Sequence, residues 1–138
     1  MAARSYWTAD PEIDEALRGR DLSRPVAMLN LLKFRRRARY APDSGETQCS
    51  GVEAYARYAR LVQPVLEPLG AAVILTGLAW LIGRPDEWDR SFIVRYNHAS
   101  DILNLSADPA YRKVAHHRTA ALADSRLLML NFDATGLG

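Results

Sequence analysis

One stretch of the chain, residues 25–34, restricts most strongly what this sequence can fold into. It reads PVAMLNLLKF, a strand pattern with apolar residues on both faces, an asparagine in the middle and a lysine near the end. Such a strand has to be covered on both faces, and an amide buried within it needs hydrogen-bond partners or lies at a cavity. The stretch therefore predicts a sheet that is packed on both sides, with polar groups at a pocket.

Length and charge bound the class of protein. The chain has 138 residues, of which 49% are hydrophobic and 25% charged, as is typical of one globular domain with a single core. We divide it into an N-terminal helical extension, residues 1–24, and a single domain, residues 25–138. The net charge of +2 is too small to favour a polyanionic partner. Four arginines that follow the first strand could bind phosphate, but we interpret them as a solvated loop rim and expect no nucleic-acid partner; they are Arg35, Arg36, Arg37 and Arg39.

The single cysteine and the N-terminal sequence indicate the compartment. Cys49 cannot form an internal disulfide, and it has neither metal-ligand spacing nor a base beside it in the sequence, so we interpret it as an inert thiol. The N-terminus lacks an apolar signal core, and no stretch approaches the roughly 20 apolar residues that span a bilayer. We therefore expect a cytoplasmic protein with no membrane partner.

Two helices and a long loop are expected in the first half of the chain. Asp10 and Pro11 start a short helix that runs to about Gly19. The apolar residues that this helix is expected to bury are Ile13, Ala16 and Leu17. Residues 35–51 are rich in Arg, Pro, Ser and Gly and are expected to form a loop, which at this length is usually a lid or a rim.

The second helix has a capping box at its start. Ser50 is the N-cap and Glu53 its partner, Pro64 kinks the helix and Gly70 closes it. Its apolar residues recur at helical spacing and predict one core-facing stripe, formed by Tyr55, Ala59, Val62, Leu66 and Leu69.

The second half predicts a hairpin, two helices and a last strand. The expected elements are strands at residues 71–83 and 90–97 around a turn at 84–87, a short helix from Ser100, a longer helix from Asp108 to about Asp124, and a strand from Leu127 to Phe132. In the second of these strands, Phe92, Val94 and Tyr96 share one face.

This order of elements is the split βαβ arrangement of ferredoxin-like α+β folds, with helices on one face of an antiparallel sheet. The other face is left bare, although the strands are too apolar for that face to meet water. We therefore expect a homodimer, packed sheet to sheet as a dimeric α+β barrel, and a monomer in light scattering would contradict it.

Several short motifs carry a family resemblance over about residues 25–132. They are MLNLLKF at 28–34, YARY at 55–58, Gly70 and Gly77, Trp88-Asp89, DPAY at 108–111, His117-Arg118 and AAL at 120–122. Together they resemble the bacterial domain-of-unknown-function family thirteen-thirty, within the dimeric α+β barrel superfamily. The resemblance implies a ferredoxin-like protomer, a homodimeric barrel and a cavity between sheet and helices. It implies no single reaction, because the superfamily includes cofactor-independent monooxygenases, lactone isomerases, dehydratases and haem-linked enzymes.

Arg118 is the strongest candidate site residue, because it falls within the apolar stripe of the last predicted helix. The residues on its side of the helix are Tyr111, Val114, Ala115 and Leu122. A guanidinium cannot lose its charge, so it needs a carboxylate, backbone carbonyls or an anionic ligand. Two interpretations stay open: Arg118 is bonded to Asp89 or to strand ends, or it holds the carboxylate, enolate or phenolate of a substrate.

Tyrosines and the buried asparagine supply further candidates. Tyr55 is expected at the centre of its helical stripe and Tyr58 at the edge, where each either fills the core or offers a hydroxyl to a proton transfer or an oxyanion. Asn30 shares a strand face with Met28 and Leu32, and it either lines the pocket or ties strands together. Lys33 points to the opposite face, where we expect it to reach water or an acidic residue.

The histidines do not predict a metal site. His116 and His117 are adjacent, so they point about 100° apart on a helix and do not chelate one ion as an i, i+4 pair does. We expect His116 to face solvent, His117 to flank the apolar stripe as a candidate general base, and His98 to begin a turn. No Gly-rich phosphate loop, nucleophile elbow or Cys-His box occurs, so no metal and no organic cofactor are expected.

The leading hypothesis is a homodimeric, cofactor-independent enzyme that acts on an aromatic or polyketide-like molecule as an isomerase, cyclase, dehydratase or monooxygenase. Arg118 would stabilise an anion, Asn30 and Tyr55 would orient an oxygen, and His117 would be the base. The candidate substrate contacts are Tyr58, Tyr111, Trp88 and Arg95, and the pattern does not fix the face of Arg95. One alternative is a non-catalytic ligand-binding or accessory protein with the same cavity. Another is a purely structural dimer in which Asn30 and Arg118 are satisfied internally.

Overall fold

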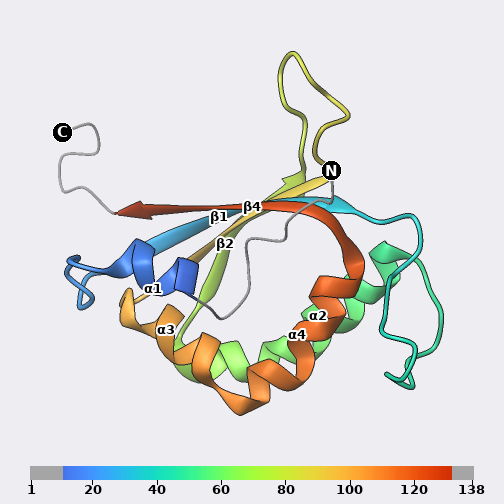
Figure 1. Cartoon of the computed structure of the whole chain (residues 1–138). Coiled ribbons are helices and arrows are strands. Elements are labelled where there is room, and N and C mark those ends of the chain that lie inside the picture. Colours follow the sequence, from blue (N-terminus) through green and yellow to red (C-terminus); the bar gives the residue numbers. More distant parts are fainter. Residues whose placement is uncertain (1–10, 132–138) are drawn as a thin grey trace.

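The chain has an α+β fold, in which a four-stranded antiparallel sheet carries helices on one side (Figure 1). The structure is a computed structural model and describes residues 11–131. The elements are α1 (Pro11–Leu17), β1 (Val26–Phe34), α2 (Gly51–Leu66), the 3₁₀ helix η1 (Glu67–Leu69), β2 (Ala72–Leu78), β3 (Arg90–Tyr96), α3 (Ser100–Ala107), α4 (Pro109–Ala121) and β4 (Leu122–Asn131). The strand order is β2-β3-β1-β4 and every pair is antiparallel. This is the ferredoxin-like arrangement that the order of predicted elements indicated.

The register of the sheet decides which side chains face the helices. Asn30 on the central strand β1 pairs with Phe92 on one side and Leu127 on the other. Met28 and Leu32 share its face and are buried with it, as predicted. The β3 residues Phe92, Val94 and Tyr96 also share this face, because they pair with Asn30, Met28 and Val26.

The predicted signals at the ends of α2 are confirmed. The Ser50 side chain accepts a hydrogen bond from the Glu53 backbone, and the Glu53 carboxylate accepts one from the Ser50 backbone, which completes the capping box. Pro64 lies inside the helix, and Gly70 ends the segment with a φ of 67°, a left-handed conformation that suits glycine. Residues 35–50 form the predicted loop, and Arg36, Arg37 and Arg39 are exposed on it.

The prediction that Tyr55 and Ala59 of α2 face the core is wrong. The buried residues of the helix are Gly51, Ala54, Tyr58 and Val62, whereas Tyr55 is only half-buried and Ala59 is exposed. The helix does not lie flat on the sheet: one side packs on α4 and the core, and the side that carries Tyr55 and Ala59 lines a cavity. An apolar stripe can serve a cavity wall as well as a core, and its spacing is the same in both cases.

Several predicted boundaries also differ from the structure. The helix α4 ends at Ala121 rather than near Asp124, and β4 begins at Leu122 rather than Leu127, because residues 122–125 pair with the end of β1. Strand β2 ends at Leu78, and residues 79–89 form a loop instead of continuing the strand to residue 83. Phe132 and the cap Asp10 lie outside the described residues.

The N-terminal helix packs into the same core as the rest of the domain. Ile13 and Leu17 of α1 are buried and belong to one cluster with Val26 and Met28 of β1, whereas Ala16 is exposed, contrary to the prediction. Within the described part of the chain, no helix is long and apolar enough to cross a membrane.

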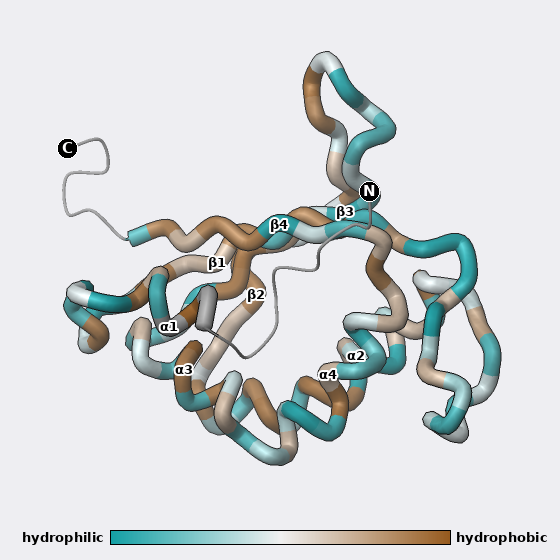
Figure 2. Tube along the Cα trace, viewed as in Figure 1, coloured by the Kyte–Doolittle hydropathy of each residue, from teal (hydrophilic) through white to brown (hydrophobic). Residues whose placement is uncertain are grey.

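The sheet face that points away from the helices carries exposed apolar side chains. One row crosses all four strands, and by register it consists of Leu75, Ile93, Leu29 and Leu128. The loop between β2 and β3 stands out from the sheet on the side opposite to the helices (Figure 1), and part of it is hydrophobic (Figure 2). In this loop Trp80 is 80% exposed and Ile82 is 95% exposed. We call this surface, the row and the loop together, the open sheet face.

Candidate ligand-binding site

A cavity of about 500 Å³ lies between the helix-covered face of the sheet and α2. This volume is within the range of pockets that hold small organic molecules. The lining residues are Met28, Asn30, Phe34, Val52, Tyr55, Ala56, Tyr58, Ala59, Val62, Gln63, Leu66, Val73, Thr76, Arg90, Phe92, Val94, Tyr96, Leu105, Arg118 and Leu127. Most are apolar or aromatic, so the cavity favours a ligand with an apolar body.

In the described part of the lining, every charged residue is positive. Arg118 comes from the last turn of α4 and Arg90 from the first residue of β3. Among the described residues of the lining there is no aspartate, glutamate or histidine. Two guanidinium groups in a mainly apolar cavity favour a ligand that carries negative charge.

Arg118 is buried, with 3% of its surface exposed. Its guanidinium lies near the hydroxyl of Tyr55 on α2, where its charge acts to lower the pKa of that phenol. The predicted pairing with Asp89 does not occur, because the Asp89 carboxylate accepts hydrogen bonds from Lys33 Nζ at 3.1 Å and from the backbone of Phe34 at 2.8 Å. Lys33 thus pairs with an acidic residue, as predicted, and Arg118 lines the cavity.

Four tyrosine hydroxyls lie within the electrostatic reach of Arg118. Burial raises the pKa of Tyr55, Tyr58, Tyr96 and Tyr111 above the ordinary value for a phenol, while the charge of Arg118 acts against that rise at each of them. All four are therefore neutral at physiological pH. A neutral hydroxyl can donate a hydrogen bond to an anion, but it is not a base at that pH.

Asn30 lies in the wall of the cavity formed by β1. It is 7% exposed, and its Nδ2 donates a hydrogen bond to the backbone oxygen of Met28 on the same strand at 3.2 Å. Among the described residues no hydrogen bond involves its Oδ1. The amide is thus oriented by its own strand and does not tie two strands together through its side chain.

Three predicted substrate contacts lie outside the cavity lining. Tyr111 is buried behind Tyr58, with 3.5 Å between the two hydroxyl oxygens. Trp88 is buried under the guanidinium of Arg126, which lies 5.3 Å from its ring centre. Arg95 on β3 pairs with Ala27 on β1, and its Nη1 donates a hydrogen bond to the side-chain oxygen of Asn97 at 3.0 Å. Of the predicted site residues, the structure therefore brings Arg118, Asn30, Tyr55 and Tyr58 together.

His117 also lies outside the lining, on the side of α4 that faces the loop 35–50. Its Nδ1 is 2.7 Å from the Tyr40 hydroxyl, and its Nε2 is 3.7 Å from Oε1 of Glu46. Burial lowers the pKa of His117 below the usual range, with a further contribution from His116. The residue is therefore not placed to act as a base on a molecule in the cavity.

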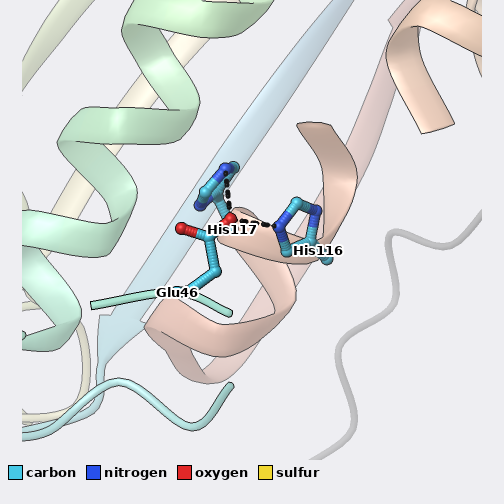
Figure 3. Close-up of side chains that lie close together, drawn as sticks. All are labelled: Glu46, His116 and His117. Carbon is cyan, nitrogen blue, oxygen red and sulfur yellow. Dashed lines mark hydrogen bonds and ion pairs between the residues drawn. The ribbon is translucent and has the colours of Figure 1, made fainter. Parts of the chain in front are cut away.

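The two adjacent histidines converge, contrary to the prediction. His116 faces solvent as expected, but its Nε2 is 3.1 Å from the same Glu46 oxygen that His117 approaches, and the two ring centres are 4.1 Å apart (Figure 3). The hydrogen bond from His116 lowers the pKa of Glu46. The angle between neighbouring positions on a helix fixes where the Cβ atoms point, but the side-chain torsions bring the ring nitrogens together.

Three residues at these sites were not predicted from the sequence. Arg90 follows a loop and opens a strand, a position that gave no sign of a cavity. Tyr40 and Glu46 lie in the loop 35–50, which has no periodic pattern from which a contact could be inferred. Only the length of that loop, which is typical of lids and rims, was a usable signal.

The chain is similar to proteins whose descriptions state no activity. A family model described as a domain of unknown function, DUF1330, matches residues 45–131. The crystal structure of methylated RPA0582 protein has 39% identity and a TM-score of 0.83, and covers 99% of each chain. Another crystal structure of RPA0582, a protein of unknown function from Rhodopseudomonas palustris, has 40% identity and a TM-score of 0.78 over 91% of this chain and 97% of that one.

A more distant match is a dimeric protein of unknown function with a ferredoxin-like fold from Bacteroides fragilis, with 11% identity and a TM-score of 0.49 over 78% of this chain and 96% of that chain. No curated protein matched the chain.

Proposed function

The chain belongs to the DUF1330 family, and we propose that it binds a small organic anion with an apolar, aromatic or polyketide-like body. The observation that carries this proposal is the buried Arg118, which lines an apolar cavity together with Tyr55, with no carboxylate in the described lining. A guanidinium that lines an apolar cavity favours a ligand with a negatively charged group, which it can bind by charge-assisted hydrogen bonds.

Each polar group in the cavity has a role in this proposal. Arg118 binds the carboxylate, enolate or phenolate of the ligand, and the Tyr55 hydroxyl is placed to donate to the same oxygen. Asn30 offers its side-chain oxygen from the opposite wall, where it can accept from a hydroxyl of the ligand. Arg90 adds positive charge at the more exposed part of the lining. The aromatic and aliphatic lining residues cover the body of the ligand.

Catalysis is the second candidate function, and one observation favours it. Arg118 and Tyr55 form a pair of donors of the kind that stabilises an enolate or another oxyanion, which suits a cofactor-independent isomerase, cyclase, dehydratase or monooxygenase. A proton would then have to leave the substrate without His117, which contacts Tyr40 of the loop 35–50 and is not part of the described lining. Because the described lining offers no base that is active at neutral pH, we rank ligand binding before catalysis.

A homodimer is part of the same proposal. The open sheet face presents an apolar row across all four strands, and beside it rises the loop that carries the exposed Trp80 and Ile82 (Figure 1). A second copy related by a twofold axis would cover the row with its own row, and each loop would lie against the other protomer. The interface is self-complementary in hydrophobicity, and the cavities lie on the outer sides of the two sheets.

Two dyes of similar shape and different charge test the binding proposal. Anilinonaphthalene sulfonate is an anion, whereas N-phenylnaphthylamine is neutral, and both become fluorescent in apolar surroundings. In the Arg118→Met variant we expect affinity for the anion to fall by about tenfold to a hundredfold, because a hydrogen bond to a charged group contributes roughly 1.5 to 3 kcal/mol. Affinity for the neutral dye should stay unchanged.

Lys113→Met is the matched control, because Lys113 is exposed on the same helix and the variant loses the same charge. Circular dichroism verifies that both variants are folded. Equal anion affinity in the wild type and in Arg118→Met would reject the proposal, as would an equal loss in Lys113→Met, which would indicate a general charge effect.

A further inference from the structure

The residues Glu46, His116 and His117 form a cluster and are not part of the described lining of the cavity. The cluster joins the loop 35–50 to α4, and Figure 3 shows both imidazole rings turned toward the carboxylate. Each of the three residues offers one ligand atom, and these atoms all lie within 4.8 Å of one another. We propose that this cluster binds one divalent transition-metal ion of the zinc type and thereby fastens the loop to α4.

The spacing of the ligand atoms fits a tetrahedral ion. Oε1 of Glu46 is 3.1 Å from Nε2 of His116 and 3.7 Å from Nε2 of His117. Ligands at about 2.0 to 2.1 Å from a tetrahedral zinc ion are roughly 3.3 Å from one another, between these two distances. His116 is exposed and Glu46 half-exposed, so both side chains can rotate to centre an ion among the three atoms.

The donor set also selects the class of ion. Two imidazoles and one carboxylate suit zinc, iron, cobalt or nickel, whereas magnesium and calcium prefer oxygen ligands alone. Three protein ligands leave coordination positions for water, and the partial exposure of His116 and Glu46 gives water access. The site therefore differs from a closed structural zinc site with four protein ligands.

Two neighbouring residues, Tyr40 and Arg57, contact the proposed metal ligands His117 and Glu46. Tyr40 Oη is 2.7 Å from Nδ1 of His117, and when Nε2 binds a metal, Nδ1 carries the proton and donates it to this oxygen. Arg57 lies 4.0 Å from Oε2 of Glu46, the oxygen that the histidines do not approach, and its Nη1 also donates to the backbone oxygen of Thr47. With a metal on Nε2, these contacts would hold the Nδ1–H tautomer of His117 and the orientation of the carboxylate.

The position of the cluster indicates what a metal ion would do. Backbone hydrogen bonds already join Arg35 and Arg39 to the C-terminal end of α4, at Ala121 and Ala120. Beyond Arg39, the contact between the loop and α4 is made by side chains, with Glu46 as the acidic partner of the helix. A metal bound to Glu46 and both histidines would hold this outer part of the loop against the helix.

Isothermal titration of zinc into the tag-free, chelator-treated protein tests the site, with cobalt absorption as a second readout. We expect one zinc ion per chain with micromolar or tighter affinity, and visible cobalt bands typical of tetrahedral coordination. Magnesium should not bind. Zinc should also raise the Tm of the wild type, because an ion that binds only the folded state stabilises it.

The variants His116→Ala and Glu46→Gln change exposed or half-exposed side chains, and each should weaken zinc binding by about tenfold or more. His98→Ala is the control, since His98 is the only histidine of the chain besides His116 and His117 and it lies beside Asp101. Zinc affinity unchanged in both cluster variants, or no zinc binding at all by the wild type, would overturn the proposal. A loss in His98→Ala as large as that in His116→Ala would overturn it as well.

Discussion

The tyrosines around Arg118 make the stability of this protein sensitive to alkaline pH. Burial raises the pKa of Tyr55, Tyr58, Tyr96 and Tyr111, so the folded chain keeps these phenols protonated where an unfolded chain ionises them, at a pH of about 10. Above that pH the unfolded state binds fewer protons than the native state. The four tyrosines therefore cost the folded state no stability below about pH 10, and above that pH the free energy of unfolding falls as the pH rises.

We predict that ionisation of these tyrosines coincides with unfolding in an alkaline titration. Absorbance at the tyrosinate band and circular dichroism in the far ultraviolet, recorded on the same sample, measure the two events. The phenolate signal of the four buried tyrosines should appear only as the helical signal is lost. Smooth ionisation of all of them near a pH of about 10 with intact circular dichroism would contradict the burial of their hydroxyls.

The sequence predicted single residues well where one periodicity decided their position. Asn30 faces the cavity because strand residues alternate, and Arg118 is buried because it falls within a helical stripe. His117 and Trp88 are also buried, but in other surroundings, since burial alone does not say which neighbours a side chain meets. The contact of His117 with Glu46 depends on the path of a loop, which no local pattern encodes.

At the scale of elements, Gly51 joins the start of α2 to the loop and to the end of α4. A Cβ atom at this position would lie 2.1 Å from the backbone oxygen of Arg35 and 2.6 Å from that of Ala121. The Gly51 backbone also donates a hydrogen bond to Arg35 at 3.1 Å. Since backbone atoms cannot rotate away as a side chain does, α2 and α4 would have to separate to admit a methyl group.

The Gly51→Ala variant should therefore lower the free energy of unfolding by about 2 to 3 kcal/mol, as overpacking does. Denaturation by urea at equal protein concentration measures this. Gly45→Ala is the control, because Gly45 has a φ of 74° and a Cβ atom added there would meet nothing within 4 Å, so only the backbone strain of roughly 1 kcal/mol remains. An equal decrease of the free energy of unfolding in the two variants would contradict the prediction that a Cβ atom at Gly51 clashes with the backbone.

The sequence predicted the types of the helices and strands and their order. It predicted where an element begins or ends only where a capping residue marks that end. Ser50 with Glu53, and Gly70, marked the limits of α2 and η1 through side-chain and backbone geometry that is local. The junction of α4 and β4 has no such cap, and its position is decided by pairing with β1, which is distant in the sequence. The exposure of β2 likewise depends on its place at the sheet edge.

For the whole molecule, the open sheet face predicts association of two copies. Leu128 is 53% exposed at one end of the apolar row, and an arginine there would place a charge in the interface. We predict that the wild type has twice the mass of one chain in light scattering and that Leu128→Arg shifts it to the mass of a single chain. Leu61→Arg, a change of the same kind on α2 at a residue 39% exposed, should stay dimeric. A monomeric wild type would contradict the homodimer.

The central claim is that the cavity beside Arg118 is a binding site for an organic anion, and a crystal structure of the protein with anilinonaphthalene sulfonate tests it most directly. We predict that the sulfonate lies within hydrogen-bonding distance of Arg118 and Tyr55, with the aromatic rings against the apolar walls of β1, β3 and α2. A dye bound only on the open sheet face, with the cavity closed by side chains around Arg118, would contradict this claim.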